Sequence, residues 1–469
     1  MTGSNFIDIL TMYQSLLKLL LNAFFMNNIS QNRLLIALST CLIFIFCISN
    51  GFRLAQKKLL WYDELFGQIR SVQRFSLGQI IKGDYINHHE ANNSPMFYLI
   101  QKGISSLFNY KISLSQWFGP SLSSEIQSVF KIDLDNIYNI REDSIDPKIL
   151  NANQKNFIMN RRLDLLNSHV KDPRGQIILR INPVIFMSLA ATLIFSYFSL
   201  NYSVSWGIYS FILIFSSNMF WGHWCEARPY ALWFFLTTVQ SLLLIILTKD
   251  EKIKLPTWNL LIITHFLLSL TVIVSVSQIL IASIILWAFK EKNLRRYIFL
   301  TALPVLICFY YYSYTIYGPY TLSNNVLDLI LTNSPREQLL IIFIFSCYLF
   351  LNRLDRFKKF SPQENIFKAS KEYLCLVILM LLSALFLLLF FKIHSTLGMP
   401  GFIYPRYFIY LTPVAIIGTT LFSINLYQLS QKNKTLKITV AAILIFLLSE
   451  QFLTLHAKYF LKLISFYGS

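Results

Sequence analysis

The composition of this chain of 469 residues excludes an ordinary soluble globular protein. Hydrophobic residues make up 55% and charged residues only 14%, whereas a soluble domain carries about a quarter charged residues. The formal net charge of +18 does not indicate a nucleic-acid partner, because the basic residues lie mostly in short loops between apolar runs. We therefore expect membrane lipids, and no nucleic acid, around the chain.

Apolar runs near the length of about twenty residues that crosses a bilayer recur along the sequence. They fall at 34–50, 178–200, 204–220, 229–248, 257–272, 273–289, 297–316, 336–351, 372–391, 404–424 and 438–457. Polar residues near the middle of 257–289 predict a tight hairpin of two helices there. The sequence thus predicts an all-α integral membrane protein with about eleven transmembrane helices.

The basic loops predict how these helices are oriented. Lys and Arg are concentrated in loops that the order of spans places on one side, at 249–254, 290–296, 353–371 and 432–437. The positive-inside rule makes that side cytoplasmic, with the N-terminus inside. The predicted parts are an interfacial amphipathic segment at 1–33, a first transmembrane helix at 34–50, a large extracytoplasmic loop at 51–177, a helix bundle at 178–457 and an extracytoplasmic tail at 458–469.

Within the large loop, residues 95–108 are apolar but too short to span, and we expect a juxtamembrane or re-entrant helix. Pro95 suits the first turn of that helix, with Ser94 as its N-cap. Residues 109–177 are polar and charged, and they predict a small mixed or helical subdomain on the outer surface.

Asp63 and Glu64 form the first cluster of polar chemistry, shortly after the first predicted span. Adjacent carboxylates near lipid are costly unless they are solvated or functional. One of them could accept the proton of an attacking hydroxyl as a general base. Alternatively, both simply favour the N-terminal dipole of a helix.

Glu90 follows His88 and His89 in the same loop, and this run could contribute metal ligands. Adjacent residues on an exposed loop rarely converge on one ion, so Glu90 is a weak metal candidate. We identify no confident metal site from the sequence.

Two arginines lie at predicted outer ends of helices, Arg228 in the turn from Glu226 to Tyr230, and Arg406 beside Tyr407. A planar guanidinium there is well placed to bind a lipid phosphate in a bidentate manner. The alternative is an arginine that snorkels to the headgroups. Arg406 near a helix N-terminus opposes the helix dipole and therefore requires a compensating anion.

His265 lies inside a predicted span. An intramembrane histidine is a site candidate by default, and a structural hydrogen bond is the alternative explanation.

Taken in order, these clusters resemble the polytopic GT-C glycosyltransferases. The branch of family 39, with the protein O-mannosyltransferases and aminoarabinose transferases, is the most similar. The motifs that carry the resemblance are Asp63-Glu64, Ser94-Pro95-Met-Phe-Tyr98, Arg180-Ile-Asn-Pro183, Glu226-Ala-Arg228-Pro-Tyr230, His265-Phe266 and Arg406-Tyr407. The chain departs from the family in having Asn93-Ser94-Pro95 where two prolines are usual, and in a larger insertion at 109–177.

The resemblance implies a GT-C fold and an inverting hexosyl- or pentosyltransferase. The sugar would pass from a polyprenyl-phosphate donor to a hydroxyl of a protein, lipid or glycan acceptor. Asp63 would be the general base with Glu64 in support, and Arg228 and Arg406 would bind the donor phosphate. Glu226, Tyr230, His265, Tyr407 and Pro95 would support the site. Some relatives bind a divalent cation, so Mg²⁺ or Mn²⁺ is a candidate cofactor.

Two other classes fit parts of the pattern. A polysaccharide polymerase would also carry outer-face arginines, without needing the Asp-Glu pair. A lipid-linked glycan flippase or another transporter would place charges near the midplane and often show internal repeats. The low content of Gly together with many Asn, Ile and Lys residues suggests an A+T-rich bacterial genome, and hence a bacterial inner membrane with the active site facing outward.

Overall fold

The computed structural model describes residues 32–85, 93–112, 169–249, 255–289, 294–313, 371–396 and 405–430. The predicted interfacial segment before residue 32, the C-terminal tail and most of the insertion after residue 112 lie outside the described residues. So do the predicted spans at 336–351 and 438–457.

The described chain is almost entirely helical, with one two-stranded ribbon. The elements before the main bundle are α2 (Asn32–Lys57), β1 (Leu60–Trp61), α3 (Tyr62–Phe66), the π-helix η1 (Gly67–Gln73), α4 (Leu77–Lys82), α5 (Met96–Leu107), β2 (His169–Val170) and α8 (Pro173–Ile178). Those that follow are α9 (Ile181–Asn201), α10 (Val204–Phe215), α11 (Asn218–His223), α12 (Tyr230–Lys249), α13 (Leu255–Ser269), η5 (Ile273–Ser275), α14 (Val276–Phe289), α15 (Leu294–Tyr297), η6 (Ile298–Ala302), α16 (Leu303–Ser313), α19 (Lys371–Thr396), η8 (Pro405–Phe408) and α20 (Leu411–Ser430).

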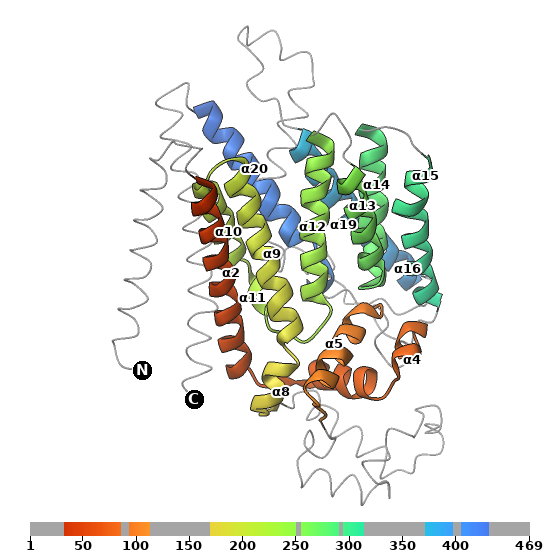
Figure 1. Ribbon diagram of the computed structural model, residues 1–469. Coiled ribbons are helices and arrows are strands. Elements are labelled where there is room, and N and C mark those ends of the chain that lie inside the picture. The colour runs from red at the N-terminus through yellow and green to blue at the C-terminus, as the bar shows by residue number, and fades with distance from the viewer. Residues whose placement is uncertain are drawn as a thin grey trace, which may run out of the picture.

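The long helices form one bundle, with α9 packed against α2, α10 and α12, and α12 packed against α13, α19 and α20 (Figure 1). Four stretches of the described chain are helical, long and apolar enough to cross a membrane: Arg33–Lys57, Pro173–Asn201, Tyr230–Lys249 and Leu294–Ser313. Several shorter apolar helices accompany them. This architecture agrees with the predicted all-α membrane protein.

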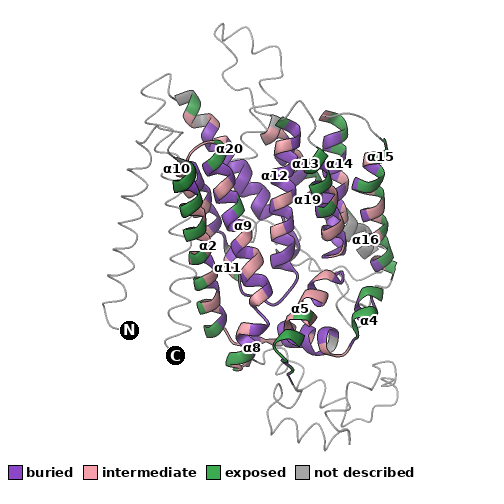
Figure 2. Ribbon diagram, viewed as in Figure 1, coloured by how far each residue is buried: buried purple, intermediate pink, exposed green. Residues whose placement is uncertain are grey.

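The burial pattern places α12 at the centre and α2 at the edge of the bundle (Figure 2). Nearly every residue of α12 is buried, including Trp233 and Phe234. In α2, by contrast, Leu34, Leu38 and Leu42 are more than half exposed. An apolar helix with a leucine-rich exposed side is what lipid contact requires, since hydrocarbon solvates such side chains.

A layer of short elements covers one end of the bundle, where α4, α5 and α8 lie together (Figure 1). The ribbon in this layer pairs β1 and β2 antiparallel, with Leu60 opposite Val170 and Trp61 opposite His169. Because β1 directly precedes α3, the ribbon ties the C-terminal end of the insertion to the Asp63 segment. The N-terminal end is also held, since Ile112 and Gln73 exchange two hydrogen bonds.

The predicted short helix after Pro95 is α5, with 12 residues. The predicted N-cap was wrong by one residue, because Pro95 occupies that position and Ser94 does not cap the helix. The Ser94 and Met96 amides instead donate to the carbonyls of Thr271 and Leu270, at 3.1 and 2.7 Å. This backbone pairing holds the segment extended before the helix begins. The predicted hairpin is present, with η5 between α13 and α14.

Candidate functional site

Asp63 lies in the first turn of α3, in the layer that covers one end of the bundle. Its side chain is 22% exposed, so the carboxylate is reachable from solvent. The neighbouring Glu64 is fully buried and points into the protein. The two adjacent carboxylates therefore have different environments, and they require separate explanations.

Glu64 is held by a bidentate ion pair with Arg180, the residue that caps the N-terminus of α9. Arg180 Nε and Nη2 donate to the two Glu64 oxygens at 2.9 and 2.6 Å. The amides of Ala227 and Trp61 also donate to this carboxylate, at 2.8 and 3.3 Å. Removing one partner of such a buried pair costs about 3–5 kcal/mol, because the other charge stays buried. Glu64 is thus a structural anchor for the Asp63 segment.

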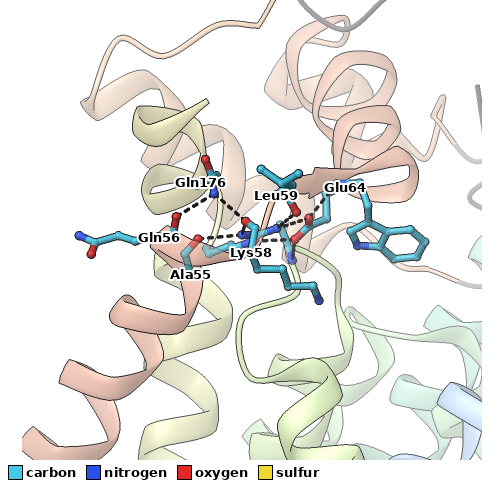
Figure 3. A network of polar contacts seen from close by, with 9 residues as sticks. Ala55, Gln56, Lys58, Leu59, Glu64 and Gln176 are labelled. Atoms are coloured by element: carbon cyan, nitrogen blue, oxygen red, sulfur yellow. Dashed lines mark hydrogen bonds and ion pairs between the residues drawn. The ribbon is translucent and has the colours of Figure 1, made fainter. Parts of the chain in front are cut away.

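Arg180 also joins this anchor to the end of α2. Figure 3 shows Glu64 and the carbonyls of Ala55 and Lys58 in one network of polar contacts. Its Nη1 donates to the carbonyls of Ala55 (2.9 Å) and Lys58, and its Nη2 donates to that of Leu59 (2.8 Å). The Gln176 amide adds bonds to the carbonyls of Gln56 and Lys58 at 2.9 and 2.7 Å. The carbonyls at a helix C-terminus have no intrahelical partner, so these side chains satisfy groups that would otherwise be buried unpaired.

Arg406 and Arg228 converge on Asp63 from sequence positions far apart. Arg406 Nη1 lies 3.0 Å from Asp63 Oδ2, and Arg228 Nη2 lies 3.9 Å from the same oxygen. Arg228 Nη1 also donates to the Asp63 carbonyl, at 3.4 Å. Two guanidinium groups therefore meet one partly exposed carboxylate. This arrangement has a surplus of positive charge and can attract an anion.

Glu226 is the third carboxylate of the site, and it is buried beside His223 in the turn before α12. Its Oε2 is within ion-pair distance of His223 Nδ1. Burial by itself raises the pKa of Glu226, but His223, Lys58 and Arg228 outweigh that effect and lower the pKa to about 2. Glu226 therefore stays ionised at neutral pH and supports the turn that holds Arg228, whose amide donates to the Glu226 carbonyl at 2.7 Å.

An aromatic side chain helps to position Arg406. The Arg406 guanidinium lies 5.7 Å from the centre of the Tyr230 ring, a cation–π distance. The Tyr230 ring in turn contacts the His223 ring, with centroids 5.0 Å apart. Tyr407 lies within η8 and is buried in the core, so it belongs to the packing that holds this turn.

His265 does not belong to this charged cluster. It is buried within α13, where Nδ1 contacts the Leu300 carbonyl at 2.8 Å and Nε2 contacts the Gln240 amide at 3.0 Å. The amide donates to Nε2, so the proton on Nδ1 donates to the carbonyl. Leu300 lies in the π-helix η6, and His265 thereby links that helix to α12 and α13. This geometry is that of a structural hydrogen bond.

The remaining candidates from the sequence are Pro95, Glu90 and a divalent metal ion. Pro95 lies at the start of α5, between the Ser94 and Met96 amides that make the backbone pairing. Glu90 lies outside the described residues. Among the residues that the structure describes, no three His, Cys, Asp or Glu side chains gather as a metal site would require. Asp63 itself faces two guanidinium groups, which repel a divalent cation, so the donor set around it does not fit Mg²⁺ or Mn²⁺.

Arg180 and His223 are the residues that sequence reasoning left out of the site. Arg180 carried a usable signal, because it is an arginine at the entry of an apolar run, as Arg228 and Arg406 are. His223 lies three residues before Glu226, close enough to pair with it in a turn. Neither residue shows from local sequence which carboxylate it binds.

The assembled site presents a reachable carboxylate and two guanidinium groups on a rigid support. It can accept a proton and bind an anion within a few ångströms. Comparison of the chain with protein-family models, with curated proteins and with solved structures gives no match.

Proposed function

We propose that this chain is a glycosyltransferase that moves a sugar from a polyprenyl-phosphate donor to a hydroxyl acceptor. The acceptor hydroxyl belongs to a protein, a lipid or a glycan. The reaction takes place on the extracytoplasmic face of a bacterial inner membrane, and the fold is of the GT-C type. The observation that carries the proposal is the convergence of Arg228 and Arg406 on Asp63.

In the proposed reaction, the acceptor oxygen attacks the anomeric carbon and its proton passes to the Asp63 carboxylate. The bond from that carbon to the phosphate oxygen breaks, and its electron pair stays on the phosphate. Arg228 and Arg406 stabilise the negative charge that develops there. Attack from the face opposite the phosphate inverts the configuration.

Glu64 takes the orienting role that the resemblance implies, and it is not itself a base. With four donors on its carboxylate, it is committed to holding α3 against α9 and the turn before α12. Together with Arg180, it is a positioning residue that keeps Asp63 within reach of the arginines. Precise placement of this kind matters, because small displacements of reacting groups cost large factors in rate.

A transporter is the less favoured alternative. Transporters place charged groups near the midplane, between helices that move. In the described bundle, the interior polar groups around His265 are neutral amides and hydroxyls, including Gln240, Gln278 and Thr237. The charged side chains of Asp63, Arg228 and Arg406 lie instead at the end of the bundle that the layer of short elements covers. A polymerase would use the same charged end, and the identity of the acceptor separates it from the other transferases.

The direct test incubates membranes that contain the chain with a panel of labelled polyprenyl-phosphate sugars. We expect one donor to yield a labelled product that membranes lacking the chain do not form. Identification of that product gives the acceptor. If no donor in a panel of hexosyl and pentosyl phosphates yields a product that depends on the chain, the transferase proposal is wrong.

A further inference from the structure

We infer that the Asp63 carboxylate and the phosphate of a polyprenyl-phosphate ligand are alternative partners of the same two guanidinium groups. An arriving phosphate would take the place of Asp63 on Arg406 and Arg228 and release the carboxylate to act as a base. This inference rests on the proposed function and adds an order of events: the donor must bind before Asp63 can accept a proton.

Asp63 Oδ2 faces both guanidinium groups, at 3.0 Å from Arg406 Nη1 and 3.9 Å from Arg228 Nη2, while Arg228 Nη1 also donates to the Asp63 backbone carbonyl at 3.4 Å. A phosphate oxygen prefers the same kind of donor at the same distances, and guanidinium binds carboxylate and phosphate in similar ways. The carboxylate therefore occupies the position that a bound phosphate oxygen would take.

The two adjacent carboxylates differ in their access to solvent. Glu64 and its partner Arg180 are both fully buried, so nothing from outside can exchange with them. Asp63 and Arg406 are each 22% exposed, and an ion pair that water reaches is weak and exchangeable. Of the two pairs, only the Asp63 pair can be displaced by a ligand while the support of the site remains intact.

A carboxylate oxygen that is engaged by guanidinium groups is poorly available to take a proton from a hydroxyl. Once the phosphate holds both arginines, the Asp63 side chain is free to turn away from them and to face the acceptor hydroxyl on the opposite side of the sugar. The site would then become active only when a donor is bound, which would disfavour unproductive chemistry in the empty enzyme.

The test measures binding of farnesyl phosphate to the purified full chain in detergent, by calorimetry. Asp63→Asn keeps the shape of the side chain and removes the competing charge, so we expect about tenfold tighter binding, equivalent to about 1.4 kcal/mol. Asp63→Ala serves as a second variant in case the Asn side chain binds the arginines itself.

Asp84→Asn is the matched control, since Asp84 is a half-buried carboxylate of the same layer and its loss changes the net charge equally. The control should bind as the wild type does.

The background Arg406→Ala separates competition from simple repulsion. If Asp63 competes for Arg406, the gain from Asp63→Asn shrinks to less than about threefold when Arg406 is absent, since coupled residues are not additive. An undiminished gain would show that Asp63 only repels the phosphate, and would overturn the inference.

Two further outcomes separate this inference from the proposed function. If the wild type transfers sugar but both Asp63 variants bind farnesyl phosphate no more tightly than it does, the inference fails and the transferase proposal stands. If the wild type neither binds farnesyl phosphate nor transfers sugar, both fail together.

Discussion

At the scale of single residues, Asp63 is the point at which three distant parts of the chain meet. Arg406 lies 343 positions along the sequence and Arg228 lies 165 positions along, yet both contact this one residue. The sequence supported placing all three on one membrane face, because the charge of the loops determines orientation. The resemblance implied that they share one site, but the sequence alone could not give the contacts between them, since those depend on how the helices pack.

Arg228→Ala and Arg406→Ala test the role of the guanidinium groups. Each variant removes one cation from the proposed phosphate site, and we expect kcat/KM for the donor to fall about a hundredfold. Arg174→Ala is the matched control, because Arg174 is an exposed arginine in α8 at the same end of the bundle. If both site variants keep the wild-type kcat/KM for the donor, the phosphate-binding role is contradicted.

Glu226 leads to a prediction about pH. Its pKa in the folded protein, about 2, lies below the value of about 4.3 for a free glutamate side chain. Ionised Glu226 therefore stabilises the fold fully above about pH 4.3, and this contribution of about 3 kcal/mol is lost as the pH falls towards 2. We expect the thermal unfolding midpoint of the wild type to fall more steeply between pH 5 and 2 than that of Glu226→Gln. Parallel curves would show that Glu226 has no such role.

At the scale of elements, the sequence predicted several helices correctly and missed the details that long-range contacts decide. The hairpin of α13 and α14 followed from an apolar run that was too long for one span with polar residues at its middle. The start of α5 was misplaced because Ser94 and Met96 bond to Thr271 and Leu270, partners that no local pattern reveals. Likewise, Asp63 and Glu64 both suit a helix start, and only the fold distinguishes the exposed one from the buried one.

The contact between α9 and α10 depends on a glycine. A Cβ added at Gly207 would lie 1.9 Å from Ser199 Oγ and 2.8 Å from the backbone oxygen of Phe195, which cannot move away easily. We expect Gly207→Ala to destabilise the protein by about 1–3 kcal/mol, measured as a lower thermal midpoint in detergent. Gly103→Ala on the exposed side of α5 meets no atom within 4 Å and should be neutral or slightly stabilising. Equal thermal midpoints for the two variants would show that α9 and α10 can accommodate the added methyl group, and would contradict the prediction.

At the scale of the whole molecule, the polar layer and the described basic residues Lys249 and Arg295 lie at opposite ends of the bundle. The end of α16 is bonded to α4, since the Tyr311 hydroxyl donates to the Ile81 carbonyl at 2.8 Å. The start of α15 therefore lies at the far end, together with exposed Arg295 (Figure 1). The sequence predicted this separation from charge alone, but it could not describe how the layer closes over the bundle.

Cysteine labelling tests this orientation. We expect Lys111→Cys to react with a membrane-impermeant maleimide added outside the cytoplasmic membrane, and Arg295→Cys to react only after the membrane is opened. Both positions are exposed in the structure, so burial does not explain protection. The unsubstituted chain measures the background from its own cysteines. Reaction of Arg295→Cys but not of Lys111→Cys from outside would invert the predicted topology.

The most direct test of the account is the rate of sugar transfer by purified Asp63→Asn, using the donor that the wild type accepts. Loss of a general base lowers the rate by about a hundredfold to ten-thousandfold, and we expect a loss in that range while the variant remains folded and binds farnesyl phosphate. Asp84→Asn should transfer sugar as the wild type does. A wild-type rate in Asp63→Asn would contradict the assignment of Asp63 as the catalytic base.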